Sequence, residues 1–258
     1  MPDGPASMVE FTVLGSCGAW PEAGRACSGY LIASGETCIV LDLGFGTLPR
    51  LLEKVPAEDV RSVFITHAHA DHCVDLFGLY RARALPSPPF LPLPVHSLPD
   101  VLHRVGALDG PAGSNRMMLE CEFHPLASGE TVEVHPFWVH ALELPHFIPN
   151  LGFRVEVDGF VIAYTGDTGP SPRVAELAEG ADLFVCEATH PAFIPPGSEE
   201  YLLSAADAGR YARECGARRL LLTHFWPNVD RAAFRTAAAR EFSGEILLAE
   251  EGMKLSLC

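Results

Sequence analysis

The chain has 258 residues, 48% of them hydrophobic, and its 33 acidic residues against 18 basic ones give a net charge of −15. A chain of this length and composition can bury a substantial core in one large domain or two small ones, and no apolar run reaches the roughly 18 residues of a membrane helix. The acidic charge disfavours a large nucleic-acid partner, because such binders usually present a basic patch to the phosphates.

The amino-terminal stretch Met1-Pro2-Asp3-Gly4-Pro5 lacks the basic and apolar regions of a signal peptide, so we expect a cytoplasmic protein. We expect residues 1–8 to be a disordered lead and residues 9–258 to form a single domain. The eight cysteines are scattered without a Cys-x-x-Cys pair, which favours buried thiols over a disulfide framework.

Five short apolar runs lead into a residue that can bind a metal or act in catalysis. Continuous runs of this length are typical of strands buried on both faces. Each could be an ordinary strand end, but in open sheets sites gather at one set of strand ends, so the recurrence predicts one shared site. In chain order the runs are residues 37–41 before Asp42, 63–65 before His67, 160–164 before Asp167, 182–186 before Glu187, and 220–223 before His224.

Other segments complete an α/β pattern of strands alternating with helices. Alternating polarity predicts a strand over residues 131–144, and a Gly-Phe-Arg-Val strand follows at residues 152–155. The proline-rich residues 84–94 predict a rigid loop or edge segment, not a domain boundary. Helices are predicted near residues 46–54, 73–83, 98–106, 172–179, 203–216 and 230–241.

Three histidines and an aspartate lie within six residues in the stretch Thr66-His67-Ala68-His69-Ala70-Asp71-His72. Histidine nitrogens and carboxylate oxygens are common ligands of zinc and related metals. On an extended chain His67 and His69 point to one face, whereas the adjacent Asp71 and His72 cannot both point the same way. The cluster therefore predicts a metal site that suits two ions better than one.

A further ligand is expected between this cluster and Asp167, where the candidates are His135, His140 and His146. A proline-bounded loop holds His146 just before the Gly-Phe-Arg-Val strand, which makes it the best candidate. His140 lies inside the alternating stretch of residues 131–144 and is expected to be structural.

These motifs follow one another in a fixed order over residues 11–257: Asp42 in Leu-Asp-Leu-Gly, the cluster at residues 67–72, His146, Asp167 in Thr-Gly-Asp-Thr, and His224 in Leu-Leu-Thr-His. The chain thereby resembles the metallo-β-lactamase superfamily. Ser28-Gly29-Tyr30-Leu31, Gly-Phe-Arg-Val and Glu187-Ala188-Thr189 make it most similar to the branch of tRNase Z and bacterial cyclic-nucleotide phosphodiesterases. The resemblance implies a four-layer αββα sandwich of the α/β class.

The resemblance also implies two divalent metal ions bridged by Asp167. One ion would be held by His67, His69 and His146. The other would be held by Asp71, His72 and His224. Zinc suits these ligands, and manganese or iron would also fit. Two dications roughly 3.5–4 Å apart can share a hydroxide, because each lowers the pKa of bound water towards about 7, and this hydroxide would be the nucleophile.

Asp42, Glu187 and His190 are the candidate catalytic residues outside the ligand set. Asp42 either orients a ligand or a nearby loop, or is only a turn-forming residue ahead of a glycine. The family has a proton-donating histidine after the Glu-Ala-Thr motif, and Leu202 takes that position here. His190 is either a substitute donor or a surface histidine beside Pro191.

The tRNase Z proteins carry a long tRNA-gripping arm between the equivalents of His146 and Asp167, and only residues 147–166 lie there in this chain. We therefore expect a small-molecule substrate and neither tRNA nor a membrane as partner, and a homodimer stays open. Trp20, Phe193 and Trp226 are candidates for pocket walls, or for ordinary packing.

Three functions stay open. The first is a phosphodiesterase for a small phosphodiester such as a cyclic nucleotide. The second is a hydrolase of thioesters, lactones or other carboxyl esters, which the missing donor histidine favours because better leaving groups need less protonation. The third is a non-catalytic, metal-binding descendant.

Overall fold

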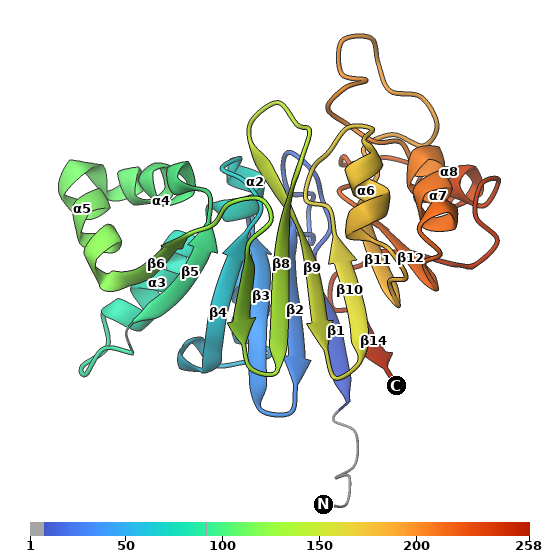
Figure 1. Cartoon of the computed structure of the whole chain (residues 1–258). Helices are drawn as coiled ribbons and strands as arrows, with labels where there is room; N and C mark the ends of the chain where they lie inside the picture. Colours follow the sequence, from blue (N-terminus) through green and yellow to red (C-terminus); the bar gives the residue numbers. More distant parts are fainter. Residues whose placement is uncertain (1–7, 91) are drawn as a thin grey trace, which may run out of the picture.

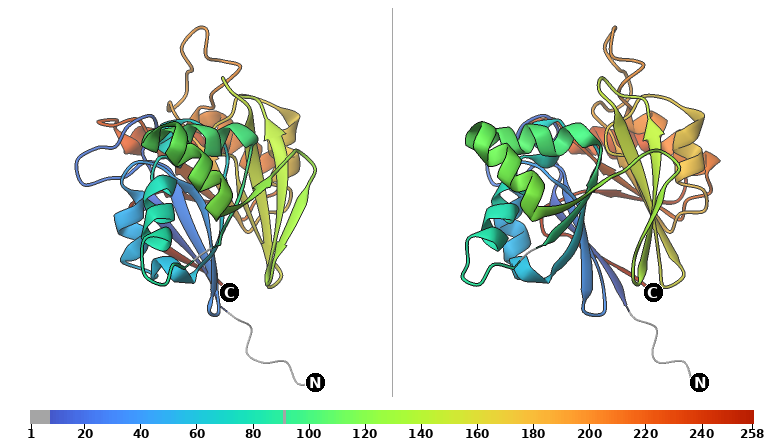
Figure 2. Two further views of the ribbon diagram at one scale, coloured as in Figure 1. Left: turned by 90° about the vertical axis from the view of Figure 1, so that its left-hand side faces the viewer. Right: turned by 60° about the vertical axis from the view of Figure 1, so that its left-hand side comes forward.

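The computed structural model describes residues 8–90 and 92–258, and the expected lead at residues 1–8 lies outside the described residues except for Met8. In this part of the chain the strands form two seven-stranded sheets that lie face to face (Figure 1). Helices cover the outer face of each sheet, so the layers run helix, sheet, sheet, helix (Figure 2). The expected α/β class with a four-layer αββα arrangement is confirmed.

The first sheet has the strand order β14–β1–β2–β3–β4–β5–β6. Neighbouring strands are antiparallel from β14 to β3 and parallel from β3 to β6. Parallel neighbours bring their carboxyl ends to the same edge of the sheet. The strands are β1 (Val9–Gly15), β2 (Gly29–Ser34), β3 (Thr37–Leu43), β4 (Val60–Ile65), β5 (Leu93–Ser97), β6 (Cys121–Pro125) and β14 (Lys254–Leu257).

The second sheet has the strand order β13–β12–β11–β10–β9–β8–β7. Its strands are antiparallel from β7 to β10 and parallel from β10 to β13, so it repeats the mixed character of the first sheet. The strands are β7 (Thr131–Val134), β8 (Phe137–Leu144), β9 (Asn150–Val157), β10 (Phe160–Tyr164), β11 (Leu183–Glu187), β12 (Arg219–Thr223) and β13 (Glu245–Leu248).

The helices divide between the two outer faces. Leu51, Leu79 and Val101 of α1, α3 and α4 pack with Val63 of β4 in one buried cluster, whereas α6, α7 and α8 pack against the second sheet. None of the helices in the described ranges is both long and apolar enough to cross a membrane. The helices are α1 (Thr47–Leu52), α2 (Ala70–Cys73), α3 (Leu76–Ala84), α4 (Pro99–Gly106), α5 (Gly110–Glu120), α6 (Pro172–Leu177), α7 (Ala205–Glu214) and α8 (Arg231–Ala238), with 3₁₀ turns η1 (Ala57–Asp59) and η2 (Ala107–Asp109).

Aromatic side chains fill the space between the sheets. The Tyr30 and Tyr164 rings meet edge to face at 4.9 Å, and Phe64 meets Phe153 at 5.8 Å in the same manner. All four are fully buried or nearly so. The buried Tyr30 hydroxyl lies 2.6 Å from the Thr223 hydroxyl, which satisfies a polar group inside the core. These contacts hold the two sheets in a fixed relation, which positions the residues at their common edge.

The predicted elements differ from the observed ones at four places. The strand expected over residues 131–144 is a hairpin, because His135-Pro136 forms a turn between β7 and β8. The helix expected at residues 73–83 is divided between α2 and α3. Helix α5 was not predicted, since its glycines and proline are weak helix formers, and β5 begins at Leu93 inside the proline-rich segment.

Candidate metal centre

The predicted ligand residues all follow strand ends at one edge of the sandwich. Helix α2 and the loop between β8 and β9, which carry some of them, lie at the upper edge in Figure 1. The stretch from His67 to His72 follows β4 and includes α2, and His146 lies in the loop between β8 and β9. Asp167 follows β10, and His224 follows β12. Strand ends of both sheets therefore deliver residues from distant parts of the sequence to one place, as the recurrence of polar residues after apolar runs predicts.

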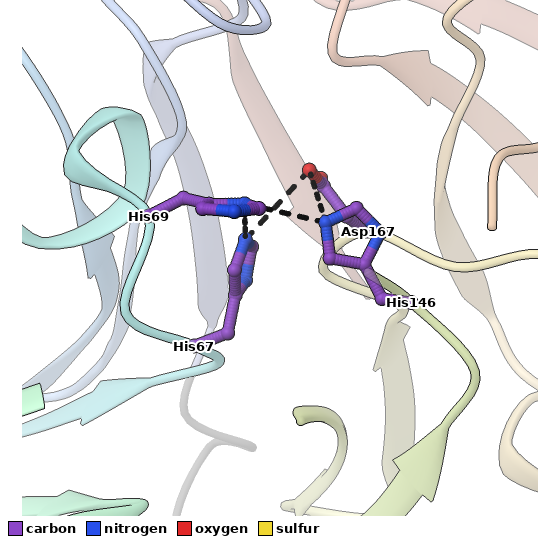
Figure 3. A group of neighbouring side chains, drawn as sticks. All are labelled: His67, His69, His146 and Asp167. Carbon is purple, nitrogen blue, oxygen red and sulfur yellow. Dashed lines mark hydrogen bonds and ion pairs between the residues drawn. The ribbon is translucent and has the colours of Figure 1, made fainter. Parts of the chain in front are cut away.

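A first group of four side chains comprises His67, His69, His146 and Asp167, whose ligand atoms all lie within 4.8 Å of one another (Figure 3). The His69 Nδ1 atom is 3.0 Å from His67 Nε2 and 3.3 Å from His146 Nε2. The Asp167 Oδ2 atom is 3.8 Å from His67 Nε2 and 3.7 Å from His146 Nε2. These four atoms face a common point and could hold one metal ion.

A second group comprises Asp71, His72, Asp167 and His224, again within 4.8 Å. The His72 Nε2 atom is 3.2 Å from Asp167 Oδ1 and 3.7 Å from Asp71 Oδ2. The His224 Nε2 atom is 3.2 Å from Asp167 Oδ2 and 3.4 Å from Asp71 Oδ2. Asp167 belongs to both groups, so its carboxylate lies between them.

The residues present fit a divalent metal. His72 Nε2 and Asp167 Oδ1 are buried, and although they lie 3.2 Å apart neither forms a hydrogen bond with the other or with another group of the protein. An unpartnered buried polar atom is costly, and a cation contacting both atoms would remove that cost. The two groups offer only imidazole nitrogens and carboxylate oxygens, the donor set of zinc, manganese and iron sites.

Asp42 fixes the orientation of His72 through a hydrogen bond to the ring nitrogen that faces away from the second group. Its Oδ2 atom lies 2.7 Å from His72 Nδ1, so His72 donates from Nδ1 and turns Nε2 towards the second group. The same carboxylate accepts hydrogen bonds from the Tyr164 hydroxyl at 2.7 Å and from the Thr66 backbone N–H at 2.8 Å. Asp42 is fully buried, with a left-handed backbone φ of 58°. The sequence left open whether Asp42 orients a ligand or only forms a turn, and these contacts favour the orientation of a ligand.

Two further candidate ligands are oriented by groups to which the sequence analysis assigned no role. His146 Nδ1 lies 3.0 Å from the Tyr201 carbonyl and donates to it, which leaves Nε2 free to face the first group. His224 Nδ1 lies 3.2 Å from the Thr189 hydroxyl. Thr189 belongs to the Glu-Ala-Thr motif, which is the only signal that could have found it; a backbone carbonyl such as that of Tyr201 leaves no trace in a sequence.

Burial and charge set the protonation of the two groups differently. Burial lowers the pKa of His67 well below its usual value and also lowers the pKa of His69 and His146, so these imidazoles keep a free lone pair near neutral pH. For His72 burial acts in the same direction, but the carboxylates of Asp167 and Asp42 outweigh it and raise the pKa. Metal binding in the second group therefore requires release of a proton.

Glu187 lies beside the centre, and His190 follows Thr189, whose hydroxyl contacts His224; neither Glu187 nor His190 belongs to either group. Burial, with the nearby Asp167 charge, raises the pKa of Glu187 to about 8. Its carboxyl accepts hydrogen bonds from the Thr168 backbone N–H at 2.6 Å and the Thr189 hydroxyl at 2.8 Å, so it braces the residues next to Asp167 and His224. His190 packs against Trp226 with ring centroids 5.3 Å apart, and its Nε2 atom is buried without a partner.

Two residues considered for the ligand set lie outside both groups. His140 contacts the Thr131 hydroxyl at 2.6 Å on the surface of the β7–β8 hairpin. His135 lies at the turn of that hairpin and lines a cavity between the β6 and β7 edges.

Comparisons with known proteins agree with this geometry. Residues 37–225 match the family model of the beta-lactamase superfamily domain. The uncharacterized protein Rv1339 of Mycobacterium tuberculosis is 34% identical over 252 residues, which cover 94% of this chain and 90% of that protein. The probable metallo-hydrolase YhfI of Bacillus subtilis is 29% identical over 249 residues, with 95% and 98% covered.

The crystal structure of YhfI, a metallo-beta-lactamase fold protein, superposes with a TM-score of 0.85 at 27% identity and covers 97% of this chain and 100% of that chain. Ribonuclease Z of Myxococcus xanthus is 26% identical over 309 aligned positions, covering 97% of this chain and 98% of the ribonuclease. Because 309 positions exceed the 258 residues of this chain, the ribonuclease carries segments that have no counterpart here.

Proposed function

The chain belongs to the metallo-β-lactamase superfamily of metal-dependent hydrolases, and from this premise we propose that it is a dinuclear phosphodiesterase for small phosphodiesters, with cyclic nucleotides as the leading candidates. The single observation that carries the proposal is the position of Asp167 in both ligand groups, since a shared carboxylate is the ordinary bridge between two divalent ions. Zinc is the expected metal, and manganese or iron would also fit the donors.

The chain's own residues would bind the metal ions and would fix the orientation of the side chains that hold them. His67, His69 and His146 would offer neutral imidazole nitrogens to one ion, and Asp71, His72 and His224 would hold the other. Bound divalent ions would lower the pKa of water and stabilise charge on the phosphoryl group. Asp42 keeps His72 in the required tautomer, and the Tyr201 carbonyl does the same for His146.

The short segment between His146 and Asp167 and the acidic charge of the chain indicate the substrate class. A ribonuclease cleaves phosphodiester bonds, and the similarity to ribonuclease Z supports the same bond here. Between His146 and Asp167 this chain forms only β9, the turn at Asp158-Gly159 and β10, which leaves no room for an arm that grips a large nucleic acid. The net charge of −15 also disfavours a polyanionic partner, so a small phosphodiester suits the protein better.

His190 is the proposed proton donor. Hydrolysis forms a bond from a water oxygen to phosphorus, breaks the ester bond and delivers a proton to the leaving oxygen. Leu202, at the position expected for the donor, is 8% exposed and cannot supply that proton. Backbone hydrogen bonds from Thr189 to Leu203 and from Ala205 to His190 place His190 beside this segment, where its buried Nε2 atom has no partner.

A second candidate function is favoured by the same leucine. Thiolates and other good leaving groups depart without a strong proton donor, so a site with Leu202 in place of histidine would suit thioesters, lactones or other carboxyl esters. In that case His190 would be a packing residue against Trp226, and its replacement would leave turnover unchanged.

The test is hydrolysis by chelated protein reloaded with zinc or manganese, using a cyclic nucleotide, bis(p-nitrophenyl) phosphate and an acyl thioester. We expect metal-dependent turnover of the phosphodiesters, lost in Asp167→Ala together with metal content and kept in the matched control His140→Ala. Turnover of the thioester alone would select the second function. Loaded protein that cleaves no phosphodiester would refute the first.

A further inference from the structure

Two tryptophans lie together beside the second ligand group. The rings of Trp20 and Trp226 are 5.9 Å apart at an interplanar angle of 47°. They come from opposite ends of the sequence, Trp20 from the loop between β1 and β2 and Trp226 from the segment after β12. Both were candidates for pocket walls, and the structure brings them into contact, whereas Phe193 is 72% exposed in the loop between β11 and α7.

Backbone contacts fix this pair to the metal centre. The Ala19 N–H, next to Trp20, donates to Asp71 Oδ2 at 2.7 Å. The Gly18 N–H donates to the Phe225 carbonyl at 2.9 Å, which joins the loop to the chain just before Trp226. A Cβ atom at Gly18 would lie 2.7 Å from the His224 ring, so only glycine lets the loop lie this close to the candidate ligand. The pair therefore lies within reach of a substituent on a phosphate held at the centre.

Both tryptophan side chains are more exposed than is usual for residues that pack in a core. Trp20 is 49% exposed and Trp226 is 37% exposed, although tryptophan is highly buried on average. Two partly exposed indole rings next to a polar, buried centre are typical of a ligand-binding wall, where an apolar surface complements a few polar groups. The tryptophans carry no charge, so they would recognise a ring and not the phosphate.

We propose that Trp20 and Trp226 form the surface on which a nucleobase of the substrate stacks, so that this site selects phosphodiesters bearing a purine or pyrimidine. The inference rests on the proposed phosphodiesterase function and names its specificity-determining residues. Stacking of a base on an aromatic side chain contributes about 1–3 kcal/mol, which corresponds to roughly a 5- to 150-fold change in affinity. Trp20 is the cleaner residue to test, because Trp226 also packs against His190.

The experiment compares Trp20→Ala and Trp20→Phe with Trp138→Ala. Trp138 is a matched control, because it is 47% exposed but lies on β8, away from both ligand groups. For cyclic AMP we expect Trp20→Ala to raise KM about 10- to 100-fold with little change in kcat, Trp20→Phe to restore most of the affinity, and Trp138→Ala to behave as the parent. For glycerol cyclic phosphate, which has no base, all variants should match the parent.

An equal rise of KM for both substrates in Trp20→Ala, or an unchanged KM for cyclic AMP, would overturn the inference. Binding of AMP and of ribose 5-phosphate, followed by calorimetry and by quenching of tryptophan fluorescence, separates this failure from failure of the proposed function. If the parent hydrolyses neither phosphodiester but binds AMP in preference to ribose 5-phosphate, and Trp20→Ala removes the preference, the stacking surface stands without the phosphodiesterase. No preference for AMP in the parent refutes the stacking surface.

Discussion

At the scale of single residues, Asp42 shows how a buried carboxylate outside both ligand groups can fix the orientation of a candidate ligand. Its two oxygens receive four hydrogen bonds from Thr66, Tyr164 and His72, three of them at Oδ2. The full burial of Asp42 and His72 means that water cannot replace a lost partner. The orientation of His72 thus depends on this one carboxylate.

Replacing Asp42 by Asn tests this dependence. The neutral amide is a weaker acceptor than the carboxylate, and its NH2 group would face either the Thr66 N–H or the donors at the Oδ2 position. The contact that orients His72 is thereby weakened, and we expect zinc affinity to fall about 10- to 100-fold. Competition with a chromophoric chelator measures the affinity. Asp100→Asn is the control, because Asp100 lies on α4 outside both ligand groups, with 44% of its side chain exposed. Unchanged affinity in Asp42→Asn would show that Asp42 serves the fold alone.

His190→Gln separates proton donation from packing. If His190 protonates the leaving oxygen, turnover of a cyclic nucleotide should fall about 10²- to 10⁴-fold, because an alkoxide is a poor leaving group. Turnover of bis(p-nitrophenyl) phosphate should change little, since p-nitrophenolate leaves without a proton. His140→Gln should affect neither substrate. A parallel loss on both substrates would assign His190 a role in site structure.

The sequence could predict the candidate ligand residues that the structure brings together, because three histidines and an aspartate in six residues have few uses other than metal binding. It could not predict Tyr164, whose hydroxyl reaches Asp42 from another sheet, because any aromatic residue would fit the apolar pattern of β10. Nor could it find the Tyr201 carbonyl, since every residue has one. Direct ligands are constrained by residue type, whereas their supports are constrained by geometry.

At the scale of elements, a row of stacked rings crosses three neighbouring strands of the first sheet. Phe64, His96 and His124 are direct register partners on β4, β5 and β6. The Phe64 and His96 rings are 4.6 Å apart and nearly parallel, and His96 and His124 are 4.7 Å apart. Burial, with the neighbouring His124, lowers the pKa of His96 to about 4.

This shift makes the stability of the sheet depend on pH. An unfolded histidine has a pKa of about 6.5, so between about pH 6.5 and pH 4 the unfolded chain binds a proton that folded His96 excludes. The stability contribution is present above pH 6.5 and is lost as the pH falls towards 4. At pH 5 this loss amounts to about 2 kcal/mol for His96.

His96→Phe keeps the stack and removes the titration. We expect the variant to lose about 2 kcal/mol less of its free energy of unfolding than the parent between pH 7.5 and pH 5, as measured by urea denaturation. Titration of all other groups is common to both proteins and cancels in the difference. Parallel pH profiles for the two proteins would contradict a depressed pKa at His96.

The elements were predictable where the apolar pattern was strong, and less so elsewhere. Strands β3, β11 and β12 are short continuous apolar runs because both of their faces are covered. The β7–β8 hairpin reads as one long strand, since residues on both sides of its turn continue the same alternation. Helix α5 contradicts local propensity, and only its packing on α4 and β6 explains it.

At the scale of the whole molecule, the candidate metal centre joins the two sheets. His67 to His72 follow a strand of the first sheet, whereas His146, Asp167 and His224 follow strands of the second. A cation held by both sets would bind the folded state and not the unfolded chain, in which these residues are far apart. Binding of this kind adds RT ln(1 + [L]/Kd) to the free energy of unfolding, about 2.7 kcal/mol at a metal concentration of 100 Kd and about 4.1 kcal/mol at 1,000 Kd.

Removal of metal should therefore lower the melting temperature of the whole protein. A chain of this size shifts by about 2–4 °C per kcal/mol, so we expect chelation to lower Tm by roughly 5–15 °C and added zinc or manganese to restore it. In Asp167→Ala neither treatment should move Tm, because the carboxylate common to both groups is gone. His140→Ala should respond as the parent does. If elemental analysis shows complete loss of metal while Tm stays constant, the ions do not link the two sheets, and the histidines would have to be held by the core alone.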